Sequence, residues 1–347
     1  MATILVHAGM PKTGSTSVQS WLVKNSEQLR DHADVFVLVA SSPTPQNPTV
    51  RLEPYESGRI NSGPVIATWS GGGQSPEIAR RFIDDLAGFA EQHPFVLVTA
   101  EALAEPFWRV DPTFLDGFEQ LARAHDVRVA YYVRPQHSAI EAGWREGGYK
   151  QKREPSRYVC EFAKRLHYRQ TADAVGAYAP NIAFTVRPFR ADLLDGGSPV
   201  QDFVGRFLSF GDVQTDAHAN PGLPLQLVNM LRYAPEGWFW SRGTQTETYP
   251  RRQLRKVFED LEIEESPKIQ RSRLILQQYC HEVFELENQQ LARRLDWATD
   301  SFVPSAVGLA AGWDIGELDR LWVPDASDVE REFFYWALRT ALDEATR

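Results

Sequence analysis

Residues 3–17 read Thr3-Ile-Leu-Val-His-Ala-Gly-Met-Pro-Lys-Thr-Gly-Ser-Thr-Ser17, and this stretch decides the fold. The apolar run at its start is typical of a buried strand, and the glycines and hydroxyl residues that follow indicate a tight loop. A helical pattern begins near residue 14. A strand that enters such a loop and then a helix presents backbone N–H groups and the positive end of the helix dipole to an anion, so the stretch predicts a phosphate site.

The position of the lysine separates this loop from that of most ATP-binding proteins. The common phosphate loop reads G-x-x-x-x-G-K-[ST], a frame that Gly9, Gly14 and Thr16 keep. Ser15 occupies the lysine position, and Lys12 lies inside the loop instead. The cation therefore approaches the anion from another side, while the small Gly14 lets backbone and phosphate come close together.

In this form, the run Pro11-Lys-Thr-Gly-Ser-Thr-Ser17 resembles the 5′-phosphosulfate loop of sulfotransferases that use 3′-phosphoadenosine 5′-phosphosulfate (PAPS). The resemblance covers about residues 1–235 and is most specific at this loop. It implies that Lys12 stabilises the phosphate oxygen on which negative charge develops. It also implies that backbone amides and hydroxyls hold the 5′-phosphate, at Thr13, Gly14, Ser15, Thr16 and Ser17.

A second part of the resemblance lies at the end of an apolar strand, where Arg134 follows Val133. In the family a strand-terminal arginine and a serine eight residues later hold the 3′-phosphate, which implies that role for Arg134. Ala142 stands where the serine belongs, and Ser138, one helical turn earlier, is the candidate to replace it. An arginine suits the task because its planar fork binds a phosphate through two hydrogen bonds. Read alone, Arg134 also fits a strand-end ion pair and Ser138 an ordinary first-turn residue.

The run Phe95-Val-Leu-Val-Thr-Ala-Glu101 brings a carboxylate to the end of another predicted strand. Open parallel sheets bind ligands at the carboxyl ends of their strands, so Glu101 should face the same crevice as Lys12. By strand order, the resemblance makes Glu101 the general base that activates the acceptor. A structural hydrogen-bond acceptor at a helix start is the alternative for Glu101, and His7 and His137 are rival bases.

Apolar runs predict four strands, at residues 4–7, 95–99, 127–133 and 182–186. Helical patterns alternate with them at residues 14–29, 76–92 and 112–124. Strands and helices in alternation favour right-handed crossovers and a parallel sheet. The sequence therefore predicts an α/β fold, a parallel β-sheet flanked by helices, and the resemblance makes it P-loop-like.

The last third of the sequence is mainly helical in its pattern. Helices are expected at residues 223–233, 251–261, 268–294 and 329–345. We expect residues 1–198 to form the α/β PAPS-binding core and residues 199–347 a mainly helical lobe packed on it, without independent folding.

Composition excludes several classes of protein. The 347 residues are 43% hydrophobic, enough for a sizeable core, and their net charge of −9 argues against a nucleic-acid partner. Cys160 and Cys280 have no metal-ligand spacing, so neither a disulfide framework nor a metal site is expected. The first strand leaves no room for a signal peptide, and no apolar run reaches the roughly 18 residues of a membrane span. We expect a cytoplasmic protein with no membrane partner.

These residues and the resemblance together imply transfer of a sulfuryl group from PAPS to an acceptor hydroxyl or amine by in-line displacement, which leaves adenosine 3′,5′-bisphosphate (PAP). No metal is expected to be required, because a lysine, an arginine and amides can stabilise a phosphosulfate, which carries less charge than a triphosphate. The acceptor is a small molecule or a glycan, and its identity and the oligomeric state stay open. A P-loop kinase with an atypical lysine and a non-catalytic nucleotide-binding protein are the alternatives.

One further feature is a local surplus of positive charge in an acidic chain. Residues 145–169 contain eight lysines or arginines against three glutamates. A solvated helix face explains such a run, and attraction of an anionic acceptor is the other interpretation.

Overall fold

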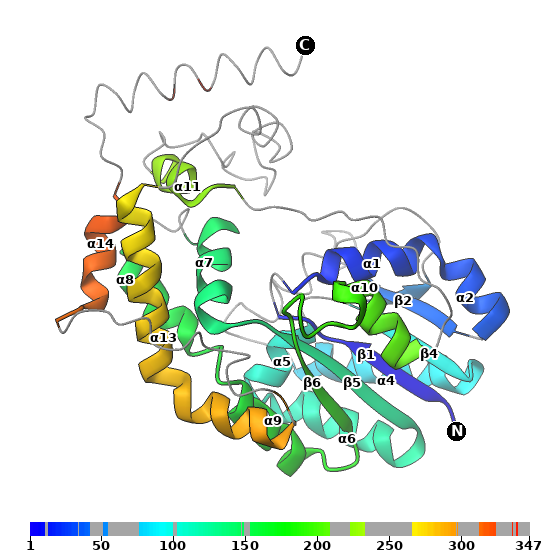
Figure 1. The fold of residues 1–347 in the computed structure, drawn as a ribbon. Helices are drawn as coiled ribbons and strands as arrows, with labels where there is room; N and C mark the ends of the chain where they lie inside the picture. Colours follow the sequence, from blue (N-terminus) through cyan, green and yellow to red (C-terminus); the bar gives the residue numbers. More distant parts are fainter. Residues whose placement is uncertain are drawn as a thin grey trace. The chain divides into compact units, whose positions relative to one another are not determined.

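The computed structural model describes residues 1–10, 13–33, 35–41, 51–54, 76–99, 103–146, 148, 153–208, 223–232, 266–295, 297, 312–323, 335 and 338. This part of the chain is built on a six-stranded sheet with the strand order β3-β2-β4-β1-β5-β6 (Figure 1). Its strands are β1 (Thr3–His7), β2 (Val35–Ser41), β3 (Arg51–Pro54), β4 (Phe95–Thr99), β5 (Asp126–Val133) and β6 (Ala183–Pro188).

β1 lies inside the sheet and pairs in parallel with β4 and β5 along its whole length. β2 and β6 extend the parallel part outward, and β3 is the antiparallel partner of β2. Each of the four apolar runs named above forms one of these strands. The prediction of an α/β fold with a parallel sheet is confirmed, since strands covered on both faces need apolar residues throughout.

Two strands are absent from the sequence prediction. β2 contains the run Val35-Phe-Val-Leu-Val-Ala40, an apolar signal that was strong enough to identify a buried strand. β3 has only four residues, two of them charged and the last a proline, so it carries no apolar signal of its own.

The helix predicted over residues 14–29 is wrong as a single element, because it is broken into α1 (Ser15–Lys24) and α2 (Ser26–Ala33). At the break, Asn25 has φ −110°. Its side-chain Nδ2 donates to the Trp21 carbonyl at 2.8 Å, while the Asn25 carbonyl accepts from the Leu29 amide at 2.8 Å. An asparagine side chain that competes with the backbone for such carbonyls ends a helix.

Helices cover both faces of the sheet (Figure 1). One face carries α1, α2 and α10 (Pro199–Phe203), preceded by a short turn, η3 (Asp195–Gly197), and continued by a π-helical turn, η4 (Val204–Leu208). The other face carries α4 (Pro76–Gln92), α5 (Ala104–Trp108), α6 (Pro112–Ala124) and α9 (Tyr168–Tyr178). The predicted helices over 76–92 and 112–124 are confirmed as α4 and α6.

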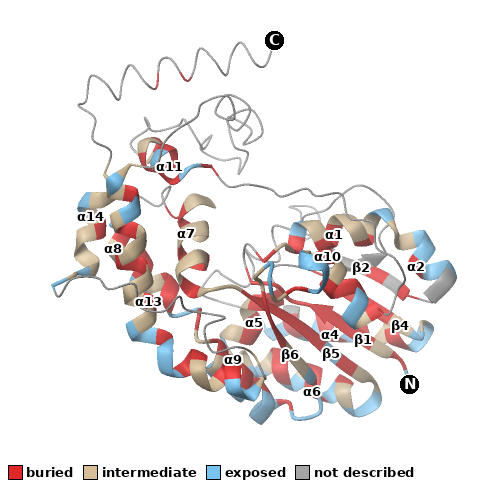
Figure 2. Ribbon diagram, viewed as in Figure 1, coloured by how far each residue is buried: buried red, intermediate tan, exposed pale blue. Residues whose placement is uncertain are grey.

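Neighbouring residues of a strand contribute to opposite cores. Leu5 and Tyr132 belong to the core beneath α1 and α10, together with Val18 and Phe203. Tyr131, one residue from Tyr132, instead contacts aromatic residues of the opposite core. That core contains Phe82, Phe107, Phe114, Phe118 and Phe184. The central strands are accordingly buried (Figure 2).

The chain divides into two compact units, each made of separate segments. The first contains the sheet and consists of Met1–Ala139, Ala163–Ala219 and Phe284–Pro304. The second consists of Ile140–Phe162, Asn220–Val283 and Ser305–Arg347. The expectation that residues 1–198 form a core and residues 199–347 a helical lobe that does not fold independently stays a prediction.

The described elements of the second unit are helical. They are the larger parts of α7 (Gln136–Glu146), α8 (Pro155–Ala163) and α13 (Pro267–Arg294), together with α11 (Leu225–Leu231), η6 (Ile315–Glu317) and α14 (Leu318–Leu321). The buried Trp144 is at their centre: its ring lies 4.9 Å from that of Trp322, and its Nε1 donates to Asn229 Oδ1 at 3.0 Å. A helical C-terminal region is confirmed for the described residues, which exclude 251–261 and all but two positions of 329–345.

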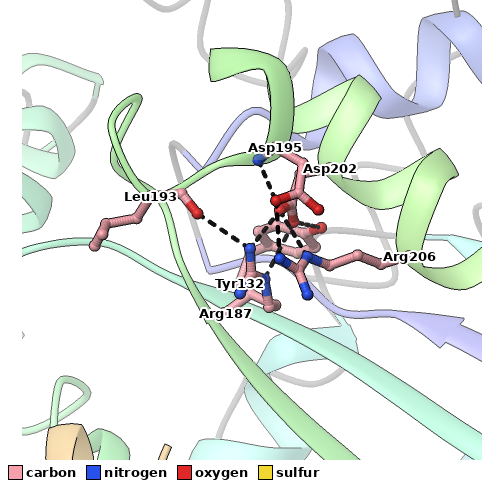
Figure 3. A network of polar contacts seen from close by, with 6 residues as sticks. All are labelled: Tyr132, Arg187, Leu193, Asp195, Asp202 and Arg206. Atoms are coloured by element: carbon pink, nitrogen blue, oxygen red, sulfur yellow. Dashed lines mark hydrogen bonds and ion pairs between the residues drawn. The ribbon is translucent and has the colours of Figure 1, made fainter. Parts of the chain in front are cut away.

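A buried carboxylate in the first unit, Asp202 on α10, joins β5 and β6 to η3 and η4 (Figure 3). Its Oδ2 accepts from the Tyr132 hydroxyl at 2.6 Å and from Arg187 Nε at 3.2 Å. Its Oδ1 accepts from the Asp195 amide at 3.1 Å and from Arg206 Nε at 3.1 Å, and Arg187 forms an ion pair with the same oxygen. This network holds α10 against the end of the sheet.

The electrostatics of this network favour the charged carboxylate. Burial acts to raise the pKa of Asp202, but hydrogen bonds from Arg187 and Tyr132 outweigh it and place the pKa below the ordinary 3.8. Burial and the neighbouring Asp202 raise the pKa of Tyr132 far above its ordinary value, so Tyr132 remains a hydroxyl donor. Removing one partner of such a buried pair leaves an uncompensated charge, which costs about 3–5 kcal/mol.

We predict that Asp202→Asn lowers the free energy of unfolding by about 3–5 kcal/mol near pH 7, because the Arg187 guanidinium loses its counter-charge. Since the folded state lowers the pKa of Asp202, this contribution is present above about pH 3.8 and is lost as the pH falls through the folded pKa. Urea unfolding of wild type and of Asp202→Asn, carried out near pH 7 and again below the folded pKa of Asp202, measures this contribution.

Asp192→Asn is the matched control, because Asp192 pairs with Arg190 at the surface. It should leave the unfolding midpoint unchanged. The prediction would be contradicted if both substitutions lowered the free energy of unfolding equally. It would also be contradicted if Asp202→Asn remained less stable than wild type by the same amount at low pH.

Candidate anion-binding site

The loop after β1 lies where the sheet reverses its strand order. β2 and β4 lie on one side of β1, while β5 and β6 lie on the other. Open α/β sheets bind ligands outside the carboxyl ends of their strands at such a reversal, because the loops diverge there. The topology thus places the residues after His7 where these folds bind ligands.

Hydrogen bonds fix the first part of this loop. The amides of Ala8 and Met10 donate to carbonyls of β5 at 3.0 and 2.9 Å, and residues 8–10 are buried. Pro11 and Lys12 lie outside the described residues. At Thr13 both the hydroxyl and the amide donate to the Met10 carbonyl, at 2.6 and 3.2 Å. The hydroxyl of Thr13 therefore closes the loop, and its contact with a phosphate stays a prediction.

Gly9 is enclosed by the hydroxyl groups of the loop. A methyl group at Gly9 would lie 2.5 Å from both Thr13 Oγ1 and Ser15 Oγ, so the loop closes around a residue without a side chain. Ser15 Oγ is buried and has no hydrogen-bond partner among the described residues. A buried hydroxyl without a partner costs about 1–3 kcal/mol, and a ligand oxygen that accepts from Ser15 would remove that cost.

Gly14 is required at the entry to α1 for two reasons. Its φ of 76° and ψ of 11° are left-handed, a conformation that glycine adopts without strain. A methyl group here would also lie 2.8 Å from Phe189 Cε2 and from Pro199 Cγ. Gly14 is therefore held between the loop after β6 and the start of α10.

The first turn of α1 leaves backbone donors outside the helix ladder. The first helical hydrogen bonds run from the amides of Ser17 and Val18 to the Gly14 carbonyl, at 2.9 and 3.1 Å. The amides of Ser15 and Thr16 precede these bonds, at the positive end of the helix dipole. The side chain of Thr16 is exposed, and that of Ser17 is half-buried. These groups can bind an anion together.

Phe189 connects the loop with Arg134. The guanidinium carbon of Arg134 lies 5.7 Å from the centre of the Phe189 ring, the same ring that borders Gly14. The Arg134 carbonyl accepts from the Tyr168 hydroxyl at 2.9 Å, and the Phe189 amide donates to the Val133 carbonyl at 2.6 Å. Two predicted binding residues, Gly14 and Arg134, thus lie on one aromatic ring. Sequence reasoning assigned no role to Phe189, although it follows a predicted strand.

Ser138 lies half-buried in the first turn of α7, on the segment that Arg134 begins. Gln136, at the start of the same helix, is fully buried, and its amide exchanges two hydrogen bonds with Asn288 at 2.7 and 3.1 Å. This pairing fixes the N-terminus of α7. The contact of Ser138 with a phosphate stays a prediction.

Of the residues expected to take part in catalysis, the structure describes His7 but neither Lys12 nor Glu101. Lys12 and Glu101 lie outside the described residues, and so their geometry adds nothing to the sequence argument. Thr99, two residues before Glu101, is the cross-strand partner of His7. Burial lowers the pKa of the His7 imidazole to about 3, which leaves it neutral and only weakly basic. That environment disfavours His7 as the general base.

Comparisons of the chain with protein-family models, with curated proteins and with solved structures find no match. None of the described helices is both long enough and apolar enough to cross a lipid bilayer. Within the same residues, no group of three or more His, Cys, Asp or Glu side chains is placed to hold a metal ion.

We predict that Gly14→Ala lowers the free energy of unfolding by about 2 kcal/mol or more, because left-handed strain of about 1–2 kcal/mol adds to overlap with Phe189 and Pro199. It should also abolish anion binding, since the first turn of α1 must shift. Thermal melting and titration with inorganic pyrophosphate measure the two effects.

Gly88→Ala is the control, because Gly88 lies inside α4 and a methyl group there meets no atom within 4 Å. This substitution should raise stability by about 0.5–1 kcal/mol and leave anion binding unchanged. A Gly14→Ala protein as stable as wild type would overturn the assignment.

Proposed function

We propose that this chain is a sulfotransferase that moves a sulfuryl group from PAPS to the hydroxyl or amine of a small molecule or glycan. The observation that carries the proposal is the loop of residues 9–17, which joins an internal parallel strand to a helix at the reversal of strand order. Within this loop the cation is Lys12, and Ser15 stands where a kinase has its lysine.

The described part of the loop fits a phosphate. The hydroxyls enclose Gly9, Ser15 Oγ is buried without a partner among the described residues, and the Ser15 and Thr16 amides lie outside the helix ladder. We therefore assign the 5′-phosphate to the loop from Lys12 to Ser17. Arg134 supplies the charge for the 3′-phosphate, with Ser138 as its neighbour on α7.

PAPS supplies an activated sulfuryl group on a phosphate leaving group. Lys12 holds a positive charge at the oxygen that becomes more negative, and the loop amides share that task. Glu101 accepts the proton of the acceptor hydroxyl or amine. These charges perform without a metal the stabilisation that kinases obtain in part from Mg²⁺, and so we propose that no metal is required.

Discrimination between PAP and AMP tests this function. Charge-assisted hydrogen bonds to a 3′-phosphate are worth about 1.5–3 kcal/mol, so wild type should bind PAP about 10- to 100-fold more tightly than AMP. We predict that Arg134→Ala removes most of this preference and leaves the affinity for AMP nearly unchanged. Isothermal calorimetry with PAP, AMP and ATP with Mg²⁺ measures all three affinities.

The control is Arg128→Ala, at the opposite end of β5, where Arg128 forms an exposed pair with Asp126. It should keep the preference for PAP. A wild-type protein that does not prefer PAP would overturn both the role of Arg134 and the proposed function, and preference for ATP with Mg²⁺ would indicate a kinase.

We predict that Lys12→Ala and Glu101→Gln each reduce turnover of PAPS with a saturating acceptor by about 10²-fold or more. The first removes a charge placed for the transition state, and the second keeps the shape of the side chain but removes its basicity. PAP affinity should fall only with Lys12→Ala.

Lys24→Ala, at the other end of α1, should turn over PAPS at the wild-type rate. Full activity of Lys12→Ala would exclude that residue from the chemistry. A wild-type protein that binds PAP but fails to turn over PAPS with every acceptor tested would be a nucleotide-binding protein without catalysis.

A further inference from the structure

The positive run at residues 145–169 is largely paired with neighbouring carboxylates. Most of its described arginines form ion pairs, which are Arg145 with Glu141, Arg153 and Arg157 with Glu161, and Arg169 with Asp173. Arg165 makes a different contact, because its guanidinium carbon lies 5.5 Å from the centre of the Trp108 ring. Arg165 is exposed, and Trp108 is half-buried. An aromatic ring therefore holds this arginine at the surface of the protein.

A second arginine lies over the same ring. The guanidinium carbon of Arg109 is 5.0 Å from the centre of the Trp108 ring, and its Nη2 is 2.7 Å from Glu105 Oε1. Burial raises the pKa of Glu105 against the opposing charges of Arg109 and Arg165, so both guanidinium charges act on one carboxylate. All four residues belong to the first unit, and we call them the Trp108 cluster.

The backbone of Arg109 is fixed at the end of α5. Its amide donates to the Glu105 carbonyl at 3.0 Å. The next two amides donate to the Phe107 and Pro106 carbonyls at 3.1 and 3.0 Å, a pattern that closes a helix with a left-handed residue. That residue is Val110, with φ 53°, and no other described residue except glycine has a positive φ. Backbone strain of this kind gathers at ligand sites, where it orders the neighbouring side chains.

The cluster lies at the carboxyl ends of the strands. α5 follows β4, which ends at Thr99. Arg165 precedes α9, whose first residue, Tyr168, donates from its hydroxyl to the Arg134 carbonyl at 2.9 Å, directly after β5. α5 and α9 also pack against each other. The Trp108 cluster therefore belongs to the edge of the sheet at which open α/β folds bind ligands.

A guanidinium that stacks on an indole ring uses its flat face, and its N–H donors point outward in the plane of the group. These donors form a fork that matches two oxygens of a carboxylate or of a sulfate. We propose that Trp108, Arg109 and Arg165 bind a carboxylate or sulfate group of the acceptor. Trp108 orients both forks, and Glu105 holds Arg109. This inference rests on the proposed function, because it adds a charged group to the acceptor of that reaction.

Titration of glucuronate into the full-length protein tests this site, with the indole ¹⁵N–H resonances of tryptophan observed by nuclear magnetic resonance. Excess PAP keeps glucuronate out of the loop of residues 9–17. Glucuronate should shift the Trp108 resonance, which Trp108→Phe identifies, and the neutral methyl ester of glucuronate should not. Arg109→Gln and Arg165→Gln should each weaken glucuronate binding by about 10-fold, since each removes one charge-assisted contact.

Arg157→Gln is the matched control, because it removes one positive charge from the same run at an exposed pair with Glu161. It should leave the affinity for glucuronate unchanged. Arg165→Lys keeps the charge but lacks the planar fork, so it should bind glucuronate as weakly as Arg165→Gln. Wild-type affinity of Arg165→Lys, an equal loss in Arg157→Gln, or equal affinity for the methyl ester overturns the proposal. Binding of inorganic sulfate without binding of glucuronate also overturns it, because the site would then serve a free ion.

The two kinds of ligand separate this inference from the proposed function. Glucuronate binding that depends on both arginines, in a protein that does not prefer PAP over AMP, would support the oxyanion site and refute the sulfotransferase. A protein that prefers PAP but does not distinguish glucuronate from its methyl ester would refute the oxyanion site alone.

Discussion

The first unit depends on the two rows of hydrogen bonds that hold β1 between β4 and β5. An internal strand cannot slide or tilt without breaking both rows, so its carboxyl end has a fixed position. The amides of Ala8 and Met10 continue one row beyond the strand. A loop that begins at such a fixed strand end can keep the Ser15 hydroxyl and the helix amides unpaired within the protein. The hydrogen bonds of the sheet offset the free energy that these unpaired groups cost.

A second constraint acts on the loop from the opposite side. Asp202 holds α10, whose first residue, Pro199, lies against Gly14 together with Phe189. The buried ion pair with Arg187 contributes little net stability of its own, but any displacement of α10 would leave charges without partners. The network therefore specifies one arrangement of α10, and through it the left-handed conformation of Gly14.

The strands and helices that the sequence predicted are those with strong local signals. β1 and β4 have continuous apolar runs, β5 and β6 are mainly apolar with Arg128 and Arg187 inside them, and α6 has an aspartate cap at Asp111 followed by a proline. The break at Asn25 depends on one side chain that competes for a carbonyl, a choice that periodicity does not reveal.

Much of the candidate site depends on contacts between residues that are distant in the sequence, which local sequence patterns do not predict. The loop itself was recognisable from Gly9, Gly14 and the hydroxyl residues, since their conformations and spacing are local properties. Phe189 beside Arg134 and Gly14, and the contact of His7 with Thr99, join residues far apart in the chain, and only the folded sheet brings them together. The roles of Lys12 and Glu101 still rest on the sequence.

The position of β1 in the sheet also has a consequence for biosynthesis. β1 precedes its partners in the chain, and β4 and β5 begin only at Phe95 and Asp126. At roughly 5–20 residues per second, the ribosome needs several seconds to complete them, and closing such long loops delays pairing further. Until then the run from Ile4 to Val6 has no sheet to enter. The nascent chain therefore exposes the apolar run of β1 first and acquires the loop geometry only after β5 is made.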